Sequence, residues 1–334
     1  MTDQPPEDLP SGTPVPIASG SPSVFSLEGR AAPALYLIGW VGCLLGVSLA
    51  LVAILGGGEG AGPLFAVSLV LASVGFLAAG GSQAVERSRR LDLAYRGPSP
   101  LTAFGAVIAL TLLGIVVVIT PLVALGLDPL SPAATAISLV LTTLVYIGVV
   151  RLLVVGPGAL SWREIGIAVP VPVAVRELLL GVAWALPILV VTAAVGLAMR
   201  GVLDMDALPP SPLPPAPDAL GLAANVLSAV VLAPIGEELF FRGFVTRAWE
   251  RVLGAGPAII RGAIFFSFAH VISLFDTNAG EGAQRALYAF IVRLPVGVAL
   301  GWLYLRRGSL WAPIGLHAAF NGIQVAALAS VEAG

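Results

Sequence analysis

The sequence predicts an all-α integral membrane protein, a polytopic bundle of about nine transmembrane helices, with eight as the alternative. Two observations favour this fold, a scarcity of charge and a series of long apolar runs. Of the 334 residues, 57% are hydrophobic and 11% are charged, and the mean hydropathy is +0.97. A soluble domain carries roughly 25% charged residues. Because so few charges cannot cover a water-facing surface, lipid is expected to cover the bundle.

Nine apolar runs have about the length that a helix needs to cross the hydrocarbon core, which is about 20 residues. Backbone groups inside lipid have no water to bond, so each run is expected to be helical. The runs lie at 34–55, 62–82, 101–126, 133–155, 177–199, 219–245, 257–274, 285–305 and 308–329.

The chain divides into four regions. Residues 1–30 are rich in Pro, Ser, Asp and Glu, which predicts a disordered cytoplasmic tail. Residues 31–199 contain the first five runs and almost no ionisable side chain within them, so they are expected to be a scaffold. A Pro-rich external linker follows at 200–218. The last four runs, at 219–330, are expected to form the catalytic transmembrane domain.

Arginines concentrate in alternate loops, which are the loops that remain in the cytoplasm. They follow the second, fourth, sixth and eighth runs, within 87–96, 151–176, 247–251 and 306–307. The opposite loops carry acidic residues and few arginines. This pattern predicts a cytoplasmic N-terminus and an external C-terminus, in what we expect to be a bacterial plasma membrane. The net charge of −2 gives no reason to expect nucleic acid as a partner.

The last four runs contain the ionisable residues that need an explanation. A charged side chain at the bilayer centre costs at least about 2.5–3.5 kcal/mol, so it persists where it is paired or functional. Glu238 and Arg242 are four residues apart, which predicts an ion pair on one helix face. Glu237 points about 100° away from Glu238. We therefore expect its carboxylate within hydrogen-bond or one-water reach of His270.

The only two histidines of the chain are His270, in the seventh run, and His317, in the ninth, where Asn321 follows four residues later. Counted from the arginine-rich ends at 1.5 Å per residue, both histidines lie about 13 Å deep, and Glu237 lies about 18 Å deep. A carboxylate, two imidazoles and a carboxamide are thus expected in one layer, which opens toward the cytoplasmic half. Each residue alone could equally serve interhelical packing.

This set of side chains can hydrolyse an amide. A glutamate assisted by a histidine can deprotonate a water molecule, and a second histidine with an asparagine can donate hydrogen bonds to the oxyanion. Alternatively, Glu237, His270 and His317 could hold Zn²⁺ with one position open to water. The residue types leave both mechanisms open, and no cofactor follows with certainty.

The motifs E-E-x-x-x-R, F-x-x-x-H and H-x-x-x-N on successive helices resemble the type II CAAX prenyl endopeptidase family, also called CPBP or Abi. Their residues here are Glu237, Glu238 and Arg242, then Phe266 and His270, then His317 and Asn321. The resemblance covers residues 224–325. It implies an intramembrane endopeptidase that cleaves near the C-terminus of membrane-anchored or lipidated substrates.

The resemblance also implies a role for each site residue. Glu237 and His270 would activate the water, and His317 and Asn321 would stabilise the oxyanion, while Glu238, Arg242 and Phe266 would support the site. The family carries a metalloprotease label, and a metal-free mechanism is also described for it. Because two of the four polar groups have roles other than metal binding in this assignment, we favour the metal-free mechanism.

Two other functions remain open at this stage. A non-catalytic scaffold or bacteriocin-immunity protein of the same fold would keep the helices and tolerate loss of Glu237. A proton-coupled transporter would use the buried Glu and His as a relay, but the sequence shows no internal repeat of the kind common in transporters. In a bacterium, a prenylated substrate is not expected, so the natural substrate stays open.

Overall fold

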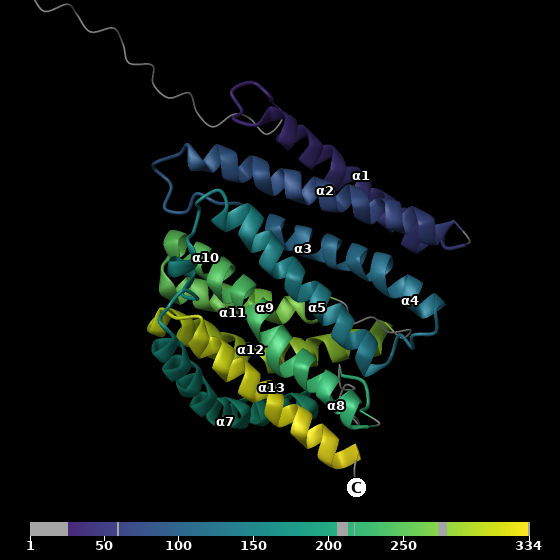
Figure 1. The fold of residues 1–334 in the computed structure, drawn as a ribbon, viewed down its shortest axis with the longest axis vertical. Helices are drawn as coiled ribbons and strands as arrows, with labels where there is room; N and C mark the ends of the chain where they lie inside the picture. The colour runs from purple at the N-terminus through teal and green to yellow at the C-terminus, as the bar shows by residue number, and fades with distance from the viewer. Residues whose placement is uncertain (1–25, 59, 206–212, 217, 273–278, 333–334) are drawn as a thin grey trace, which may run out of the picture.

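The computed structural model describes residues 26–58, 60–205, 213–216, 218–272 and 279–332. Within these ranges the chain forms helices and no strand, and eight helical spans are long and apolar enough to cross a membrane (Figure 1). The predicted all-α membrane bundle is thereby confirmed. Most of the predicted tail and part of the predicted linker lie outside the described residues.

The eight spans correspond to eight of the nine predicted runs. The first three are α1 (Pro33–Gly56), α2 (Ala61–Ser88), and α3 (Pro100–Gly114) continued by η1 (Ile115–Ile119) and α4 (Thr120–Ala124). Next come α5 (Pro132–Val149) with η2 (Val150–Val155), and α7 (Val171–Val202), after the short α6 (Trp162–Ile165). The sixth is α8 (Ala219–Val226), η3 (Leu227–Leu232), α9 (Ala233–Glu237), η4 (Glu238–Thr246) and α10 (Arg247–Leu253). The last two are α12 (Ala279–Arg307) and α13 (Trp311–Glu332).

The predicted run at 257–274 differs from the others. It forms α11 (Ala255–Ala269), a helix of 15 residues that ends just before His270. Its length of roughly 22 Å is short of the roughly 30 Å hydrocarbon core. The chain leaves the helix in a turn in which Val271 and Ile272 both donate to the carbonyl of Phe268. His270 therefore lies at a helix end, where the sequence predicted a position inside a span.

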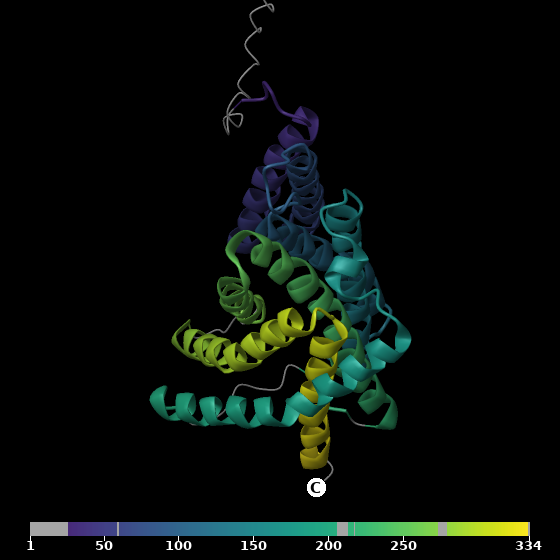
Figure 2. The same cartoon turned by 90° about the vertical axis from the view of Figure 1, so that its left-hand side faces the viewer.

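Small residues bring the helices together in two places. α1 and α2 form an antiparallel pair in which a Cβ on Gly42 would lie 2.7 Å from the Cα of Gly75. On the other side of the bundle, a Cβ on Gly181 of α7 would overlap the carbonyl of Ala312 in α13. Figure 2 shows α7 (teal) beside α12 (yellow-green), with α13 (yellow) crossing α7.

The position of α7 changes the expected division of the chain. The sequence placed this helix in the scaffold at 31–199, ahead of the linker. In the structure α7 packs against α12 and α13, which lie beyond the linker. The packing unit around the candidate site therefore includes α7, because glycines on α7 and α13 allow a close backbone approach that cannot be read from local sequence.

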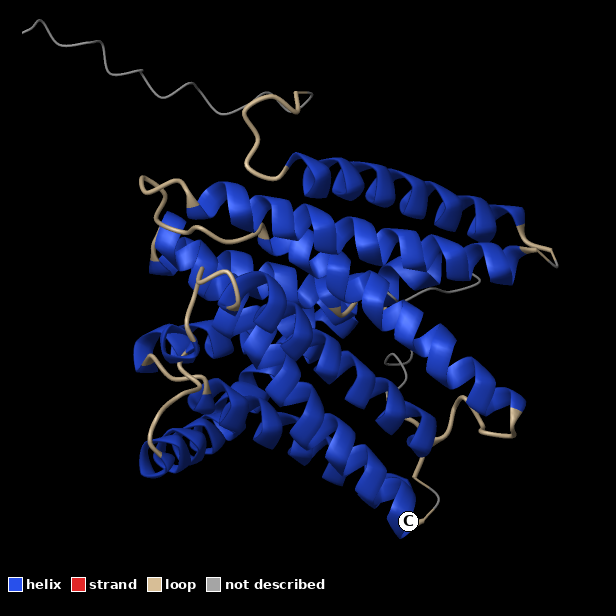
Figure 3. Ribbon diagram, turned by 45° about the horizontal axis from the view of Figure 1, so that its top comes forward, coloured by secondary structure: helices blue, strands red, loops and turns tan. Residues whose placement is uncertain are grey.

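Three turns that contain arginines or are flanked by them lie together at one end of the bundle. The turns at 89–99, 156–161 and 308–310 lie on the left in Figure 1, and the turn at 125–131 lies on the right. Figure 3 shows the loops gathered at the ends of the helices. This arrangement agrees with the alternation of arginine-bearing and acidic loops. Which side of the membrane each end faces stays a prediction.

Candidate active site

The sixth span places Glu238 and Arg242 inside the protein, where they form the predicted ion pair. Arg242 Nη1 lies 3.0 Å from Glu238 Oε1, and the two side chains are 1% and 0% exposed. Arg242 Nη2 also donates to the carbonyl of Gly297, at 3.4 Å, and its guanidinium lies 4.2 Å from the Phe266 ring centroid. The buried cation is thus held by a carboxylate, a carbonyl and an aromatic face.

His317 of α13 contacts the same carboxylate. Its Nδ1 lies 2.8 Å from Glu238 Oε1, and its Nε2 lies 3.9 Å from Glu237 Oε2. The ring meets Phe266 edge-on, with centroids 5.9 Å apart. Glu238 therefore joins Arg242 and His317, a link between two helices that the sequence did not reveal.

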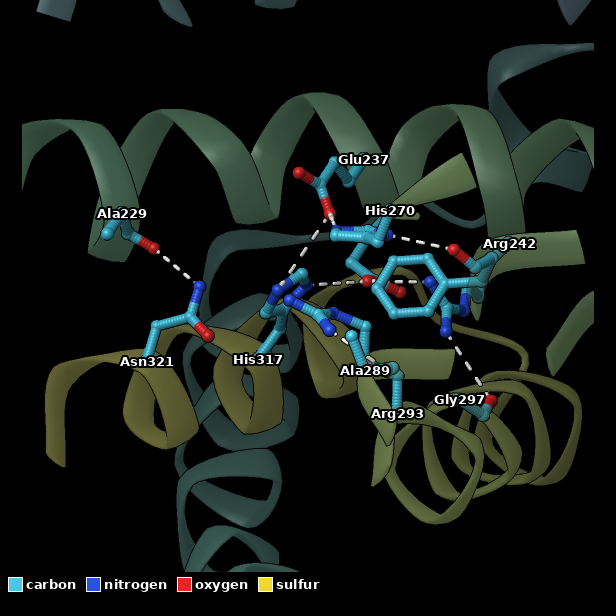
Figure 4. Close-up of polar contacts among 11 residues, drawn as sticks. Ala229, Glu237, Arg242, His270, Ala289, Arg293, Gly297, His317 and Asn321 are labelled. Carbon is cyan, nitrogen blue, oxygen red and sulfur yellow. Dashed lines mark hydrogen bonds and ion pairs between the residues drawn. The ribbon is translucent and has the colours of Figure 1, made fainter. Parts of the chain in front are cut away.

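His270 follows the last residue of α11 and faces Glu237 (Figure 4). Its Nδ1 lies 2.8 Å from the carbonyl oxygen of Phe266, and its Nε2 lies 3.4 Å from Glu237 Oε2. The expected proximity of Glu237 to His270 is confirmed.

The partners of the two rings determine where their protons lie. The carbonyl of Phe266 and the ionised carboxylate of Glu238 can only accept, so both histidines carry a proton on Nδ1. In the neutral rings, both Nε2 lone pairs then face Glu237 Oε2, a buried oxygen with no hydrogen-bond partner. A water molecule that donates to Glu237 Oε2 and to one Nε2 would satisfy two of these three acceptors, and a proton on His270 Nε2 would satisfy the contact to Glu237 directly.

Asn321 lies apart from the Glu237–His270 pair in Figure 4. Its Nδ2 donates to the carbonyl of Ala229, at 2.8 Å. Pro234 explains why that carbonyl is available, because proline has no N–H and the π-helical partner of residue 229 would be residue 234. One amide hydrogen of Asn321 is thus engaged, and the second remains for another acceptor.

The residues do not fit the alternative zinc site. In the described part of the chain, no group of three His, Cys, Asp or Glu side chains is placed to hold a metal ion. Ligands at about 2.0–2.1 Å from a tetrahedral zinc lie roughly 3.4 Å apart, whereas His317 Nε2 is 3.9 Å from Glu237 Oε2. His270 Nε2 lies 3.4 Å from the same oxygen, so one of the two spacings fits a zinc site and the other is too wide. The metalloprotease label has no support here, and the possible ligand set of Glu237, His270 and His317 stays a hypothesis.

Sequence reasoning missed Arg293, on α12. Its side chain is half-buried, and Nη1 donates to the carbonyl of Ala289, at 2.9 Å. Figure 4 shows it pointing from α12 toward the side where His317 lies. The signal was present, since Arg293 is a single arginine in the middle of the apolar run at 285–305.

An apolar cavity of about 680 Å³ lies between α7 and α12. Its wall includes Trp184, Ile188, Val191, Leu294, Trp302 and Leu316. Leu316 precedes His317 and Leu294 follows Arg293. The helices that form the cavity are therefore the ones that carry part of the site.

The C-terminal part of this chain is similar to known proteins. Residues 219–323 match the family described as type II CAAX prenyl endopeptidase Rce1-like. The "CAAX prenyl protease 2" of Homo sapiens is 28% identical over 97 residues, which are 27% of this chain and 30% of the human protein. No solved structure matches the chain. The resemblance to the type II CAAX prenyl endopeptidases is thus confirmed for residues 219–323, the segment that holds every residue of the candidate site.

Proposed function

We propose that this integral membrane protein is an intramembrane endopeptidase that hydrolyses a peptide bond of a membrane-anchored or lipidated substrate. One observation carries the proposal. Glu237 Oε2 is buried, has no hydrogen-bond partner and faces the Nε2 atoms of His270 and His317. That arrangement suits a water molecule held next to a general base. The match of residues 219–323 to the CAAX endopeptidase family supports the same activity.

In the proposed reaction, the water between Glu237 and His270 attacks the carbonyl carbon of the substrate. Its oxygen forms the new C–O bond as Glu237 takes the proton. The electron pair of the C=O bond moves to the oxygen and creates the oxyanion. When the C–N bond breaks, the proton passes from Glu237 to the leaving nitrogen, so Glu237 returns to its starting state.

Two groups are proposed to stabilise the oxyanion. The second amide hydrogen of Asn321 can donate directly. His317 donates a hydrogen bond from Nδ1 to Glu238. Its Nε2 is an acceptor in the neutral ring that faces Glu237, so His317 can donate to the oxyanion only after Nε2 takes up a proton. Glu238 and Arg242 keep the His317 ring in position, because Glu238 Oε1 contacts both side chains. Removing one such oxyanion donor typically costs 10²–10³-fold in turnover.

The apolar cavity supports a substrate with a hydrocarbon chain. Its volume, about 680 Å³, is in the range of small-molecule sites. A chain that moves from lipid into this cavity gains little from the hydrophobic effect, because lipid is equally apolar. The cavity would therefore position a lipid anchor, and thereby the peptide attached to it, more than it would increase affinity.

We also propose that the arginine-rich end faces the cytoplasm, which places the N-terminus there and the C-terminus outside. The clustering of the arginine-rich turns at one end of the bundle supports this orientation. Cysteine labelling on residues of the two ends in intact cells would test it.

The test is turnover of membrane-anchored peptides by purified protein in vesicles, compared with the Glu237→Gln variant. Glutamine keeps the shape and polarity of the side chain but is not a base, so turnover is expected to fall at least about 10³-fold while the protein stays folded. Glu250→Gln is the matched control, because Glu250 pairs with Arg247 at the end of the span, away from the site.

Activity that survives Glu237→Gln unchanged would remove the general base and favour the scaffold or immunity function. Proton-coupled uptake by the same vesicles, lost in Glu237→Gln without any peptide cleavage by the wild type, would favour the transporter. Turnover that a chelator abolishes and zinc restores would overturn the metal-free mechanism.

A further inference from the structure

A second cavity, of about 250 Å³, lies beside the turn at 89–99 and shares no residue with the candidate active site. Its wall is formed by the end of α2, the start of α3, the loop between them, α10 and α11. The polar and aromatic residues in this wall are Arg87, Tyr95, Ser99, Trp249 and Arg261. Two of the described lining residues are cationic and none of them is acidic. A cavity with this balance of charge favours an anionic ligand.

Both arginines of this cavity keep hydrogen-bond donors for a ligand. Arg87 uses Nη1 to donate to the carbonyl of Gly97, at 2.9 Å, and an arginine has five N–H donors. Arg261 is exposed and makes no hydrogen bond or ion pair within the described chain. The carboxylates next to the wall in the sequence, Glu86 and Glu250, are paired with other arginines. The two guanidinium groups are therefore available to an anion.

Neutral groups add to these two charges. Tyr95 is 6% exposed, and its hydroxyl has no hydrogen-bond partner in the described chain. Burial raises the pKa of Tyr95, so the hydroxyl keeps its proton and can donate it to a hydrogen bond. Ser99 precedes α3, whose first turn has no side-chain cap, so the positive end of the α3 dipole lies at the cavity. Charged donors beside a helix N-terminus are typical of phosphate sites.

The cavity lies at the depth of lipid headgroups. Arg87 is in the last turn of α2 and Pro100 is the first residue of α3, so both lie where transmembrane spans end. Trp249 belongs to a residue type that is enriched at the boundary between lipid and water. Basic pockets between transmembrane helices at this boundary bind the headgroups of anionic lipids. The position therefore favours a lipid phosphate over other anions.

An apolar strip continues from the cavity along α11. Arg261, Ile264 and Phe268 are three and four residues apart, so they lie on one face of the helix. Ile264 is 47% exposed and Phe268 is 46% exposed. A phospholipid has the matching order of groups, with a phosphate at the headgroup and hydrocarbon chains below it. Inorganic phosphate would use only the first part of this surface.

We propose that the cavity binds an anionic phospholipid, with its phosphate between Arg87 and Arg261 and its acyl chains along α11. The lipid joins α2, one of the front helices, to α11. His270 follows the last residue of α11, about 13 Å from Arg261 along the helix axis. The bound lipid thus holds the helix that positions His270 without touching the candidate active site.

The experiment measures binding of phosphatidylglycerol to the purified protein in detergent, by titration followed by native mass spectrometry. Arg261→Gln should weaken this binding at least about 10-fold, the scale of a hydrogen bond to a charged group. This variant removes an exposed side chain without protein partners, so the fold is kept. Arg87→Gln should weaken binding as well, but it also loses the bond to Gly97. The matched control is Arg89→Gln, an exposed arginine outside the cavity wall, which should bind like the wild type.

Three further ligands identify which part of the lipid is bound. Diacylglycerol with the same chains lacks the phosphate, phosphatidylcholine carries a cationic choline beside it, and inorganic phosphate lacks the chains. Each should bind the wild type more weakly than phosphatidylglycerol. Equal binding of diacylglycerol, or displacement of the lipid by an equal concentration of inorganic phosphate, would overturn the proposal. It would also be overturned if Arg261→Gln and Arg89→Gln weakened binding equally, since that result indicates a general attraction to surface charge.

Thermal unfolding tests the proposed link between α2 and α11. A ligand that binds only the folded protein raises its unfolding temperature. Phosphatidylglycerol should therefore raise the Tm of the wild type and of Arg89→Gln, and raise that of Arg261→Gln much less. An unchanged wild-type Tm at saturating lipid would contradict the proposal. Neither binding nor unfolding requires peptide cleavage, so both results are independent of the proposed endopeptidase function.

Discussion

Two clusters around glutamates, a buried one at Glu177 and a partly exposed one at Glu237, differ in how completely their oxygens are bonded. Glu177 of α7 is 2% exposed, and both its oxygens accept from Arg307, at 2.6 and 2.7 Å, with a further bond from Arg176 at 2.8 Å. Glu237 faces two histidines, and its Oε2 has no hydrogen-bond partner. Both carboxylates are expensive to bury, but only the first has all its partners within the protein.

The comparison shows how structure and function can be distinguished among buried charges. A fully bonded cluster such as Glu177 with Arg307 joins the start of α7 to the end of α12 and leaves nothing for a ligand. A cluster with an unsatisfied acceptor retains capacity for a ligand, and a buried acceptor in that state calls for an explanation. Removing a side chain that contacts Glu177 should therefore reduce the stability of the protein. Removing one that faces Glu237 should reduce turnover.

The ion pair of Glu238 and Arg242 should show the largest effect on stability, because both side chains are buried and Glu238 Oε1 contacts both Arg242 and His317, while Glu238 Oε2 has no hydrogen-bond partner in the described chain. Arg242→Ala leaves a buried carboxylate without its cation, at a cost of about 3–5 kcal/mol. The yield of folded protein in detergent and its thermal unfolding temperature should both fall well below those of Arg306→Ala. Wild-type yield and unfolding temperature would mean that the pair contributes nothing to folding.

Asn321 has both a packing contact and a proposed catalytic role. Its Nδ2 donates one hydrogen bond to the Ala229 carbonyl and is proposed to donate another to the oxyanion. Asn321→Ala should reduce turnover by about 10²–10³-fold and stability by about 1 kcal/mol. Turnover per folded molecule, with folding measured in the same sample, separates the two effects. If stability alone falls, Asn321 is a helix-packing residue and the oxyanion role is wrong.

The Glu177 cluster should show the smallest effect. Glu177→Gln removes the charge that Arg307 and Arg176 contact, but those side chains are 31% and 70% exposed, so water compensates for part of the loss. We expect about 1 kcal/mol of lost stability by thermal unfolding, and turnover within roughly two-fold of wild type. A loss of turnover as large as that of Glu237→Gln would abolish the distinction between the two clusters.

The sequence predicted the parts of the site that depend on local spacing. The pair of Glu238 and Arg242 follows from the repeat of the helix. Apolar length predicted nine spans, and eight of these runs are long enough to span a membrane in the described chain. The proximity of Glu237 to His270 was predictable because a charge in lipid needs a partner and few polar groups are available. These predictions require no knowledge of how the helices are arranged.

Other features depend on packing between distant segments and could not be predicted. The contact of His317 with Glu238 requires the distance between two helices. The early end of α11 was hidden because the apolar run continues past His270. The packing of α7 against α12 and α13 depends on the close approach of Gly181 to α13. Arg293 was visible in the sequence, but its hydrogen bond to the Ala289 carbonyl, with no ion pair to a carboxylate among the described residues, required the structure.

The measurement that tests the central claim most directly is a single turnover in H₂¹⁸O, with enzyme in excess over a membrane-anchored peptide. If Glu237 activates a water molecule, the new C-terminal carboxylate of the product gains one ¹⁸O and becomes 2 Da heavier. The fragment of the digested enzyme that contains Glu237 then keeps its mass. Label in the Glu237 side chain and an unlabelled product would show that Glu237 attacks the substrate itself, and would contradict the general-base account.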